Sequence, residues 1–223
     1  DALPILNADD RLYGPDDLVS LAQEVDGVLT CSTERWTPSL IERLPASLRL
    51  IANIGVGYDN IDLDAATRRG IAVSNTPVVT EDTADLVFAL LLATCRRLSA
   101  SERHLRDGNW TAGASQLGQR VHGKRLGIVG FGAIGQAVAR RARGFNMSVL
   151  YHGPAPSPDA AAALEARFCP TLEELLREAD IVSLNCTLNA QTRHLMNAET
   201  LAMLKPGAVL INAGRGPLVD ENA

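Results

Sequence analysis

The chain has 223 residues, 46% of them hydrophobic, which is enough for a packed core in one large domain or two small ones. Its formal net charge of −5 leaves no basic face for nucleic acid, and its longest apolar run, residues 86–93, is far shorter than the roughly 20 residues that cross a bilayer. The four cysteines show no C-x-x-C spacing, so they are typical of reduced thiols in a cytoplasmic protein, and we expect no metal site.

Strands and helices alternate through the first third of the chain. The pattern predicts helices at 15–25, 38–44 and 62–69, and strands at 27–31, 48–54 and 71–73. Pro38 stands where a first-turn proline is tolerated, and Gly70 follows the third helix where a C-terminal glycine is common. This alternation is typical of a parallel α/β unit, which we interpret as a separate small domain.

Residues 80–106 are predicted to form one long helix. Thr80 is a suitable N-cap, and Glu81 and Asp82 suit the positive end of the helix dipole. Because residues 86–93 are apolar on nearly all sides, we expect this part of the helix to be buried all round. An irregular, glycine-containing loop at 110–123 follows.

A glycine-rich turn lies between a predicted strand at 126–129 and a predicted helix that ends at Gly144. A second strand is expected at 147–151, so strand, turn, helix and strand fit the context of the dinucleotide fingerprint G-x-G-x-x-G. Its glycines allow a tight turn, close approach of a pyrophosphate and close helix packing, and the helix N-terminus favours an anion. The alternative is a glycine-rich turn without a ligand. The six residues of the fingerprint are Gly130, Phe131, Gly132, Ala133, Ile134 and Gly135.

The end of the second strand bears on the choice of cofactor. An NAD site usually has an acidic residue there, which binds the ribose 2′-hydroxyl. This chain has His152 and Gly153 instead, and no acid occurs before Asp159. Without the acid, a 2′-phosphate meets no repulsion, so we expect NADP(H) to be favoured and NAD(H) to remain possible.

The rest of the chain continues the alternation. Helices are predicted at 157–166, 171–179 and 198–204 and from Pro217 onward, with strands at 180–184 and 208–212. A doubly wound domain normally continues with at least one more strand and helix, so we expect the sequence to be truncated at its C-terminus.

Three further stretches carry candidate chemistry. Residues 53–62 contain two glycines one residue apart after a strand, which is a pattern that exposes backbone amides to an anion. Residues 75–85 begin with Asn75, Thr76 and Pro77. Residues 211–217 place Arg215 directly after a buried strand, where its guanidinium fork suits a carboxylate or carbonyl oxygen. A surface or phosphate-positioning arginine is the alternative.

Together these stretches resemble the D-isomer-specific 2-hydroxyacid dehydrogenases, most closely the glyoxylate/hydroxypyruvate reductase branch. The resemblance implies an α/β fold of two doubly wound parallel-sheet domains. These are a flavodoxin-like substrate domain, incomplete here, at 1–98 and a Rossmann dinucleotide-binding domain, lacking its C-terminal part, at 99–223. The matching stretches are NIGVGYDNIDL (53–63), NTPVVTEDTADLVFALLLATCRR (75–97), GKRLGIVGFGAIGQAVA (123–139), ADIVSLNCTLNAQTRHLMN (179–197) and LKPGAVLINAGRGPLVDE (204–221).

The resemblance also implies roles for single residues. Arg215 matches the catalytic arginine, and the amides of Val56 and Gly57 match those that bind the substrate carboxylate. The other matches are to the cofactor site: Phe131 to Ile134 at the pyrophosphate, Thr83, Asn212, Ala213 and Gly214 beside the nicotinamide, and Cys186 and Thr187 beneath the adenosine ribose. The proton-donating histidine and its glutamate partner are expected beyond Ala223.

The resemblance implies NAD(P)H-dependent reduction of glyoxylate or hydroxypyruvate by a homodimer that forms through the cofactor domain. D-lactate, phosphoglycerate and formate dehydrogenases share the scaffold, so the 2-oxo acid stays open. A dinucleotide-sensing interaction protein and an inactive fragment of the same fold are the alternatives.

Overall fold

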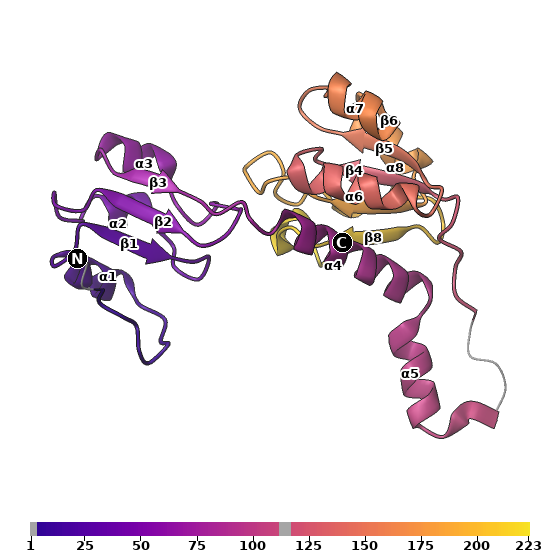
Figure 1. Ribbon diagram of the computed structural model, residues 1–223, viewed down its shortest axis with the longest axis horizontal. Helices are drawn as coiled ribbons and strands as arrows, with labels where there is room; N and C mark the ends of the chain where they lie inside the picture. Colours follow the sequence, from indigo (N-terminus) through magenta and orange to yellow (C-terminus); the bar gives the residue numbers. More distant parts are fainter. Residues whose placement is uncertain (1–3, 112–116) are drawn as a thin grey trace. The chain divides into compact units, whose positions relative to one another are not determined.

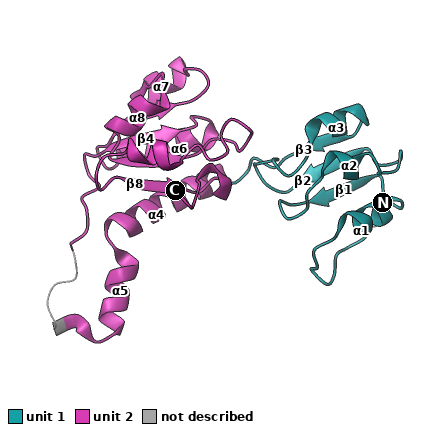
Figure 2. Ribbon diagram, turned by 180° about the vertical axis from the view of Figure 1, so that it is seen from behind, with its two compact units in different colours: residues 1–79 teal, residues 80–223 magenta. Residues whose placement is uncertain are grey.

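The computed structural model describes residues 4–111 and 117–223, and it divides the chain into two compact units, Asp1–Val79 and Thr80–Ala223 (Figure 2). Part of the loop expected at 110–123, residues 112–116, lies outside the described residues. The boundary between the units lies after Val79 rather than after residue 98. The reason is that the helix beginning at Thr80 packs against elements of the second unit.

Unit 1 is built on a parallel sheet of three strands in the order β1–β2–β3. The strands are β1 (Gly27–Thr30), β2 (Leu50–Asn53) and β3 (Ala72–Ser74), and the helices are α1 (Pro15–Ala22), α2 (Pro38–Ile41) and α3 (Leu63–Arg68). Two of the helices begin at side-chain N-caps. The side chains of Thr37 and Asp62 accept hydrogen bonds from backbone amides in the first turns of α2 and α3. The core of this unit includes Trp36, Leu40, Ile41, Ile51 and Ala65.

Unit 2 contains a parallel sheet of five strands in the order β6–β5–β4–β7–β8. Numbered within the unit, this order reads 3-2-1-4-5, which is the order of the doubly wound dinucleotide-binding fold. The parallel sheets of both units confirm the predicted α/β class. The strands are β4 (Arg125–Val129), β5 (Ser148–His152), β6 (Ala166–Phe168), β7 (Ile181–Leu184) and β8 (Val209–Asn212).

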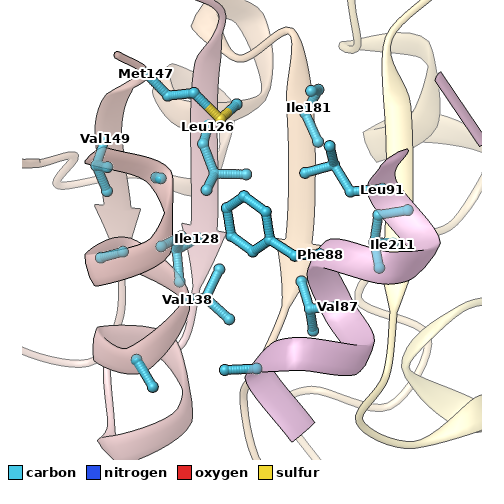
Figure 3. Close-up of a cluster of buried hydrophobic side chains, with 14 of the residues drawn as sticks. Val87, Phe88, Leu91, Leu126, Ile128, Val138, Met147, Val149, Ile181 and Ile211 are labelled. Carbon is cyan, nitrogen blue, oxygen red and sulfur yellow. The ribbon is translucent and has the colours of Figure 1, made fainter. Parts of the chain in front are cut away.

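Two apolar layers cover the two faces of the five-stranded sheet. One face packs against α4 (Thr80–Cys95), α6 (Ala133–Arg143) and α7 (Pro158–Leu164), and the other packs against α8 (Leu172–Glu178) and the segment that contains α9 (Ala198–Ala202). Figure 3 shows Val87, Phe88 and Leu91 of α4 pointing at the strands, beside Val138 of α6. This packing explains why α4 belongs to unit 2.

The helix expected at 80–106 is interrupted. The structure contains α4, which ends at Cys95, and a second helix, α5 (Leu98–Arg106), with Arg97 between them in the left-handed conformation at φ 54° (Figure 1). The expectation that residues 86–93 are buried on all sides was also wrong. Leu91 is fully buried, but the side chains of Leu86 and Leu90 are 51% and 39% exposed, because α4 presents only one face to the sheet.

Three smaller elements differ from expectation. The helix predicted at 157–166 ends at Leu164, and the short strand β6 that follows was not predicted. The helix predicted from Pro217 onward is a single 3₁₀ turn, Gly216–Leu218, which is followed by a β-bridge between Met196 and Val219.

Candidate functional site

Four strands of unit 2 end at the same level. Val129 pairs in register with His152 and with Leu184, and Leu184 pairs with Asn212. Each of these residues is the last of its strand, so the segments that follow them emerge at one carboxyl edge of the sheet (Figure 1). The strand order reverses between β4 and β7, which is where doubly wound sheets bind their ligands.

The fingerprint glycines at this edge have different surroundings. Gly130 has φ +91°, and a β-carbon on it would lie 2.5 Å from the backbone nitrogen of Cys186. A β-carbon on Gly135 would lie 2.2 Å from the carbonyl oxygen of Gly130, whereas a β-carbon on Gly132 would meet nothing within 4 Å. Packing therefore requires glycine at 130 and 135, while Gly132 faces open space that a ligand can occupy.

The helix that follows the turn offers an anion site. Gly132 is the N-cap of α6 and contributes no side-chain cap, and the first turn of α6 holds no acidic residue. The first amides of an α-helix lack acceptors within the helix, and the helix dipole makes this end positive. Open space at Gly132 beside these amides fits the pyrophosphate of a dinucleotide.

Phe131 contributes its backbone rather than its side chain to the turn. The ring is buried and stacks on Tyr151 with a centroid distance of 4.0 Å. The hydroxyl oxygen of Tyr151 accepts a hydrogen bond of 2.9 Å from the amide of Ser157, which orders the segment after β5.

His152 is the last residue of β5 and Gly153 follows it, at the end of the second strand where the sequence predicts them. The Nδ1 atom of His152 lies 2.9 Å from the carbonyl oxygen of Cys169 and must donate, because a carbonyl oxygen only accepts. A β-carbon on Gly153 would meet nothing within 4 Å, so this position has room for a side chain.

The segment after β7 packs directly behind the fingerprint turn. The amide of Asn185 donates to the carbonyl oxygen of Val129 at 2.7 Å, which brings Cys186 against Gly130. Burial raises the pKa of the Cys186 thiol, so this side chain stays neutral. The carbonyl oxygen of Thr187 accepts a hydrogen bond from the Thr192 hydroxyl at 2.6 Å.

The side chain of Asn212 makes hydrogen bonds across the turn that follows β8 and contains Arg215. The side chain of Asn212 donates to the carbonyl oxygen of Arg215 at 2.9 Å and accepts from the amide of Gly214 at 3.1 Å. Ala213 lies inside this turn, and the Arg215 side chain is half-buried. Thr83, in the first turn of α4, is partly buried and belongs to the same unit.

Val56 and Gly57 lie in unit 1, in the loop that follows β2. Gly55 has φ +143°, a conformation that favours glycine. Within the described residues, the backbone amides of Val56 and Gly57 donate no hydrogen bond. These amides stay candidates for binding an anion.

Sequence reasoning missed the polar side chains that support this loop. Asn53 and Asn60 are 1% and 7% exposed, yet neither was singled out by itself. Asparagine is common in surface turns, so its type and spacing do not distinguish a buried support from a solvated one.

Metal-binding clusters and membrane-spanning helices are two further features that would bear on function. Across residues 4–111 and 117–223, no group of three or more histidine, cysteine, aspartate or glutamate side chains could hold a metal ion. No helix within the same ranges is long and apolar enough to cross a membrane.

The fold and the carboxyl-edge site define unit 2 as an α/β dinucleotide-binding domain. Residues 88–223 match the family model described as D-isomer specific 2-hydroxyacid dehydrogenase, NAD binding domain. The chain belongs to this family, as its sequence motifs predict.

Similar proteins include a glyoxylate reductase of Pyrococcus horikoshii, which is 47% identical over 213 residues. The match covers 92% of this chain and 63% of the relative, so the chain spans less than two thirds of that relative's length. The glyoxylate/hydroxypyruvate reductase B of Shigella boydii is 47% identical over 204 residues, with coverage of 90% and 62%.

Solved structures are also similar to this chain. A glyoxylate reductase from Paecilomyes thermophila is 37% identical with a TM-score of 0.86, and the match covers 95% of this chain and 67% of that one. A D-lactate dehydrogenase from Aquifex aeolicus, solved with NAD and lactic acid, is 29% identical with a TM-score of 0.84, and coverage is 94% and 61%.

Proposed function

We propose that the full-length protein reduces a small 2-oxo acid, glyoxylate or hydroxypyruvate, to the 2-hydroxy acid with NAD(P)H. One observation carries this proposal. Val129, Leu184 and Asn212 pair in register at the ends of their strands, so the glycine turn and Arg215 follow at the same edge of one sheet. The names of the Pyrococcus and Shigella relatives support the same substrate class.

When bound, a nicotinamide cofactor would supply the hydride that reduces the keto carbon of the substrate. Arg215 orients the keto oxygen and stabilises the negative charge that grows there, an effect that is largest where water is excluded. The Asn212 turn supports this role by fixing the backbone on both sides of Gly214. Val56 and Gly57 bind the substrate carboxylate through their amides.

The proton that completes the reaction would come from a histidine oriented by a glutamate, the pair that the resemblance to the 2-hydroxyacid dehydrogenases implies. The ring of His152 does not serve as this donor, because its Nδ1 atom is committed to the Cys169 carbonyl oxygen.

NADP(H) is the preferred cofactor in this proposal. The amides at the start of α6 bind the pyrophosphate, with Cys186 and Thr187 beneath the adenosine ribose. Thr83, Ala213 and Gly214 lie on the nicotinamide side. His152 and Gly153 replace the acid that would repel a 2′-phosphate.

We also propose that the protein works in the cytoplasm as a homodimer that forms through unit 2. The exposed Leu86 and Leu90 on α4 support an interface there, since a second copy would cover them. Free thiols at all four cysteines support a reducing compartment.

The test is a steady-state assay of the full-length protein with glyoxylate and with hydroxypyruvate, each with NADPH and with NADH. Turnover with NADPH dominant supports both the reaction and the cofactor preference, and NADH dominance overturns the preference alone. Absence of turnover alongside tight cofactor binding would overturn the proposed reaction and favour a dinucleotide-sensing role.

A further inference from the structure

The segment that follows β3 contacts the loop of Val56 and Gly57 through three hydrogen bonds. The amide of Thr76 donates to the carbonyl oxygen of Gly55 at 3.0 Å, and the Thr76 hydroxyl accepts from the amide of Gly55 at 2.7 Å. The side chain of Asn75 donates to the carbonyl oxygen of Val56 at 2.8 Å. Two neighbouring residues therefore bind three backbone groups of the loop.

These contacts fix the orientation of the loop amides, because each peptide unit is planar. In a planar trans peptide, the carbonyl of one residue and the N–H of the next point in opposite directions. The carbonyls of Gly55 and Val56 both point at the segment 75–76, so the N–H groups of Val56 and Gly57 both point away from it. Both N–H groups therefore point away from the segment 75–76 and donate no hydrogen bond within the described residues.

A buried asparagine pair supports the loop from the β2 side. The side chain of Asn53 donates to the carbonyl oxygen of Gly57 at 2.8 Å, and its oxygen accepts from the side chain of Asn60 at 3.3 Å. Asn60 in turn donates to the carbonyl oxygens of Cys31 and Glu34 at 3.0 and 3.1 Å. The loop is thus held at three consecutive carbonyls, those of Gly55, Val56 and Gly57.

We infer that Asn75 and Thr76 are positioning residues that set the affinity for the substrate carboxylate by orienting the amides of Val56 and Gly57. This inference deepens the proposed function and rests on it for the identity of the substrate. Thr76 and Asn75 contact the backbone of Gly55 and Val56, so in this inference they act through the amides and not on the substrate.

The experiment compares Thr76→Val, Asn75→Ala and the conservative Thr76→Ser in the full-length protein. Loss of one neutral hydrogen bond corresponds to about a 5- to 10-fold change in binding. We expect KM for glyoxylate to rise by about that factor in Thr76→Val and in Asn75→Ala. We expect kcat and KM for NADPH to stay unchanged, and Thr76→Ser, which keeps the hydroxyl, to restore the wild-type value.

A second substrate separates positioning from a general structural effect. Glyoxal has an aldehyde in place of the carboxylate, so its kcat/KM should not change in these variants. The preference for glyoxylate over glyoxal should therefore fall by about the same 5- to 10-fold. Ser74→Ala is the matched control, because Ser74 is the last residue of β3, next to Asn75, and its hydroxyl makes no hydrogen bond within the described residues.

An unchanged KM for glyoxylate in Thr76→Val and Asn75→Ala would overturn the inference, and so would an equal loss with glyoxal. If Thr76→Val does not fold, Asn75→Ala decides alone, since Asn75 is exposed and its removal leaves no cavity.

Amide NMR distinguishes failure of the inference from failure of the proposed function. If the wild-type protein reduces no 2-oxo acid, glyoxylate is titrated into the ¹⁵N-labelled full-length protein. The Val56 and Gly57 amide resonances should shift in wild type and shift less at equal concentration in Thr76→Val. No shift in wild type, or equal shifts in both proteins, would overturn the inference.

Discussion

A β-carbon on Gly135 would lie 2.2 Å from the carbonyl oxygen of Gly130, so the first turn of α6 and the end of β4 are in contact without room for a methyl group. The same β-carbon would lie 3.2 Å from a side-chain carbon of Ile128. This contact sets how closely α6 approaches the sheet, and with it the position of the helix amides at the carboxyl edge.

Gly135→Ala should therefore destabilise unit 2. The backbone carbonyl of Gly130 cannot move aside as a flexible side chain would, so we expect the free energy of unfolding to fall by about 1–3 kcal/mol. The dissociation constant for NADPH should rise as α6 shifts. Urea unfolding and fluorescence titration measure the two effects.

Gly153→Ala is the matched control for this change. A β-carbon there meets nothing within 4 Å, so the free energy of unfolding should stay within about 0.5 kcal/mol of wild type. Equal stability of the two variants would contradict the packing role of Gly135.

Arg215→Ala should lower kcat by about 10²–10³-fold in the full-length protein, because it removes the group that stabilises charge on the keto oxygen. Binding of NADPH should change little. Arg215→Lys should recover part of the loss, since an ammonium keeps the charge but lacks the planar fork.

The control for this loss is Arg68→Ala on the exposed face of α3, which removes one positive charge elsewhere. Unchanged turnover in Arg215→Ala, measured under saturating cofactor, would remove Arg215 from the mechanism.

Gly153→Asp should shift the cofactor preference toward NADH. A side chain fits at this position, and a carboxylate there would repel a 2′-phosphate and accept a hydrogen bond from a ribose hydroxyl. We expect the ratio of kcat/KM for NADPH to that for NADH to fall by about 10-fold or more, which corresponds to roughly 1.4 kcal/mol. Gly153→Asn has nearly the same size without the charge and should produce a much smaller shift. An unchanged ratio in Gly153→Asp would mean that the 2′-phosphate of NADPH does not bind near Gly153.

Leu90→Glu should prevent dimerisation. Leu90 is 39% exposed on the outer face of α4, and burial of an unpaired carboxylate in an apolar interface is strongly unfavourable. Light scattering after size exclusion should give half the wild-type mass. Leu63→Glu is the control, because Leu63 is equally exposed, at 40%, but lies in unit 1. A dimeric Leu90→Glu protein, or a wild-type monomer, would contradict the proposed interface.

The sequence by itself determined the features that depend on local pattern. The alternation of helices and strands through most of the chain and the glycine turn at 130–135 occur where they were predicted. Each of these depends on residues within a few positions of one another, so the sequence contains the whole interaction. The position of His152 at the end of β5, and those of Gly153 after β5 and Arg215 after β8, follow in the same way.

Only the tertiary structure decided which faces and which distant groups come together. An apolar run does not show which side of a helix meets a sheet, so Leu86 and Leu90 were expected to be buried and are exposed. The left-handed Arg97 ends α4 in a run without glycine or proline. Register decided that Val129 and Asn212 end at one level, and the packing of β3 beside β2 brought Asn75 and Thr76 against the loop of Val56. These outcomes depend on contacts between residues far apart in the chain, which no local pattern contains.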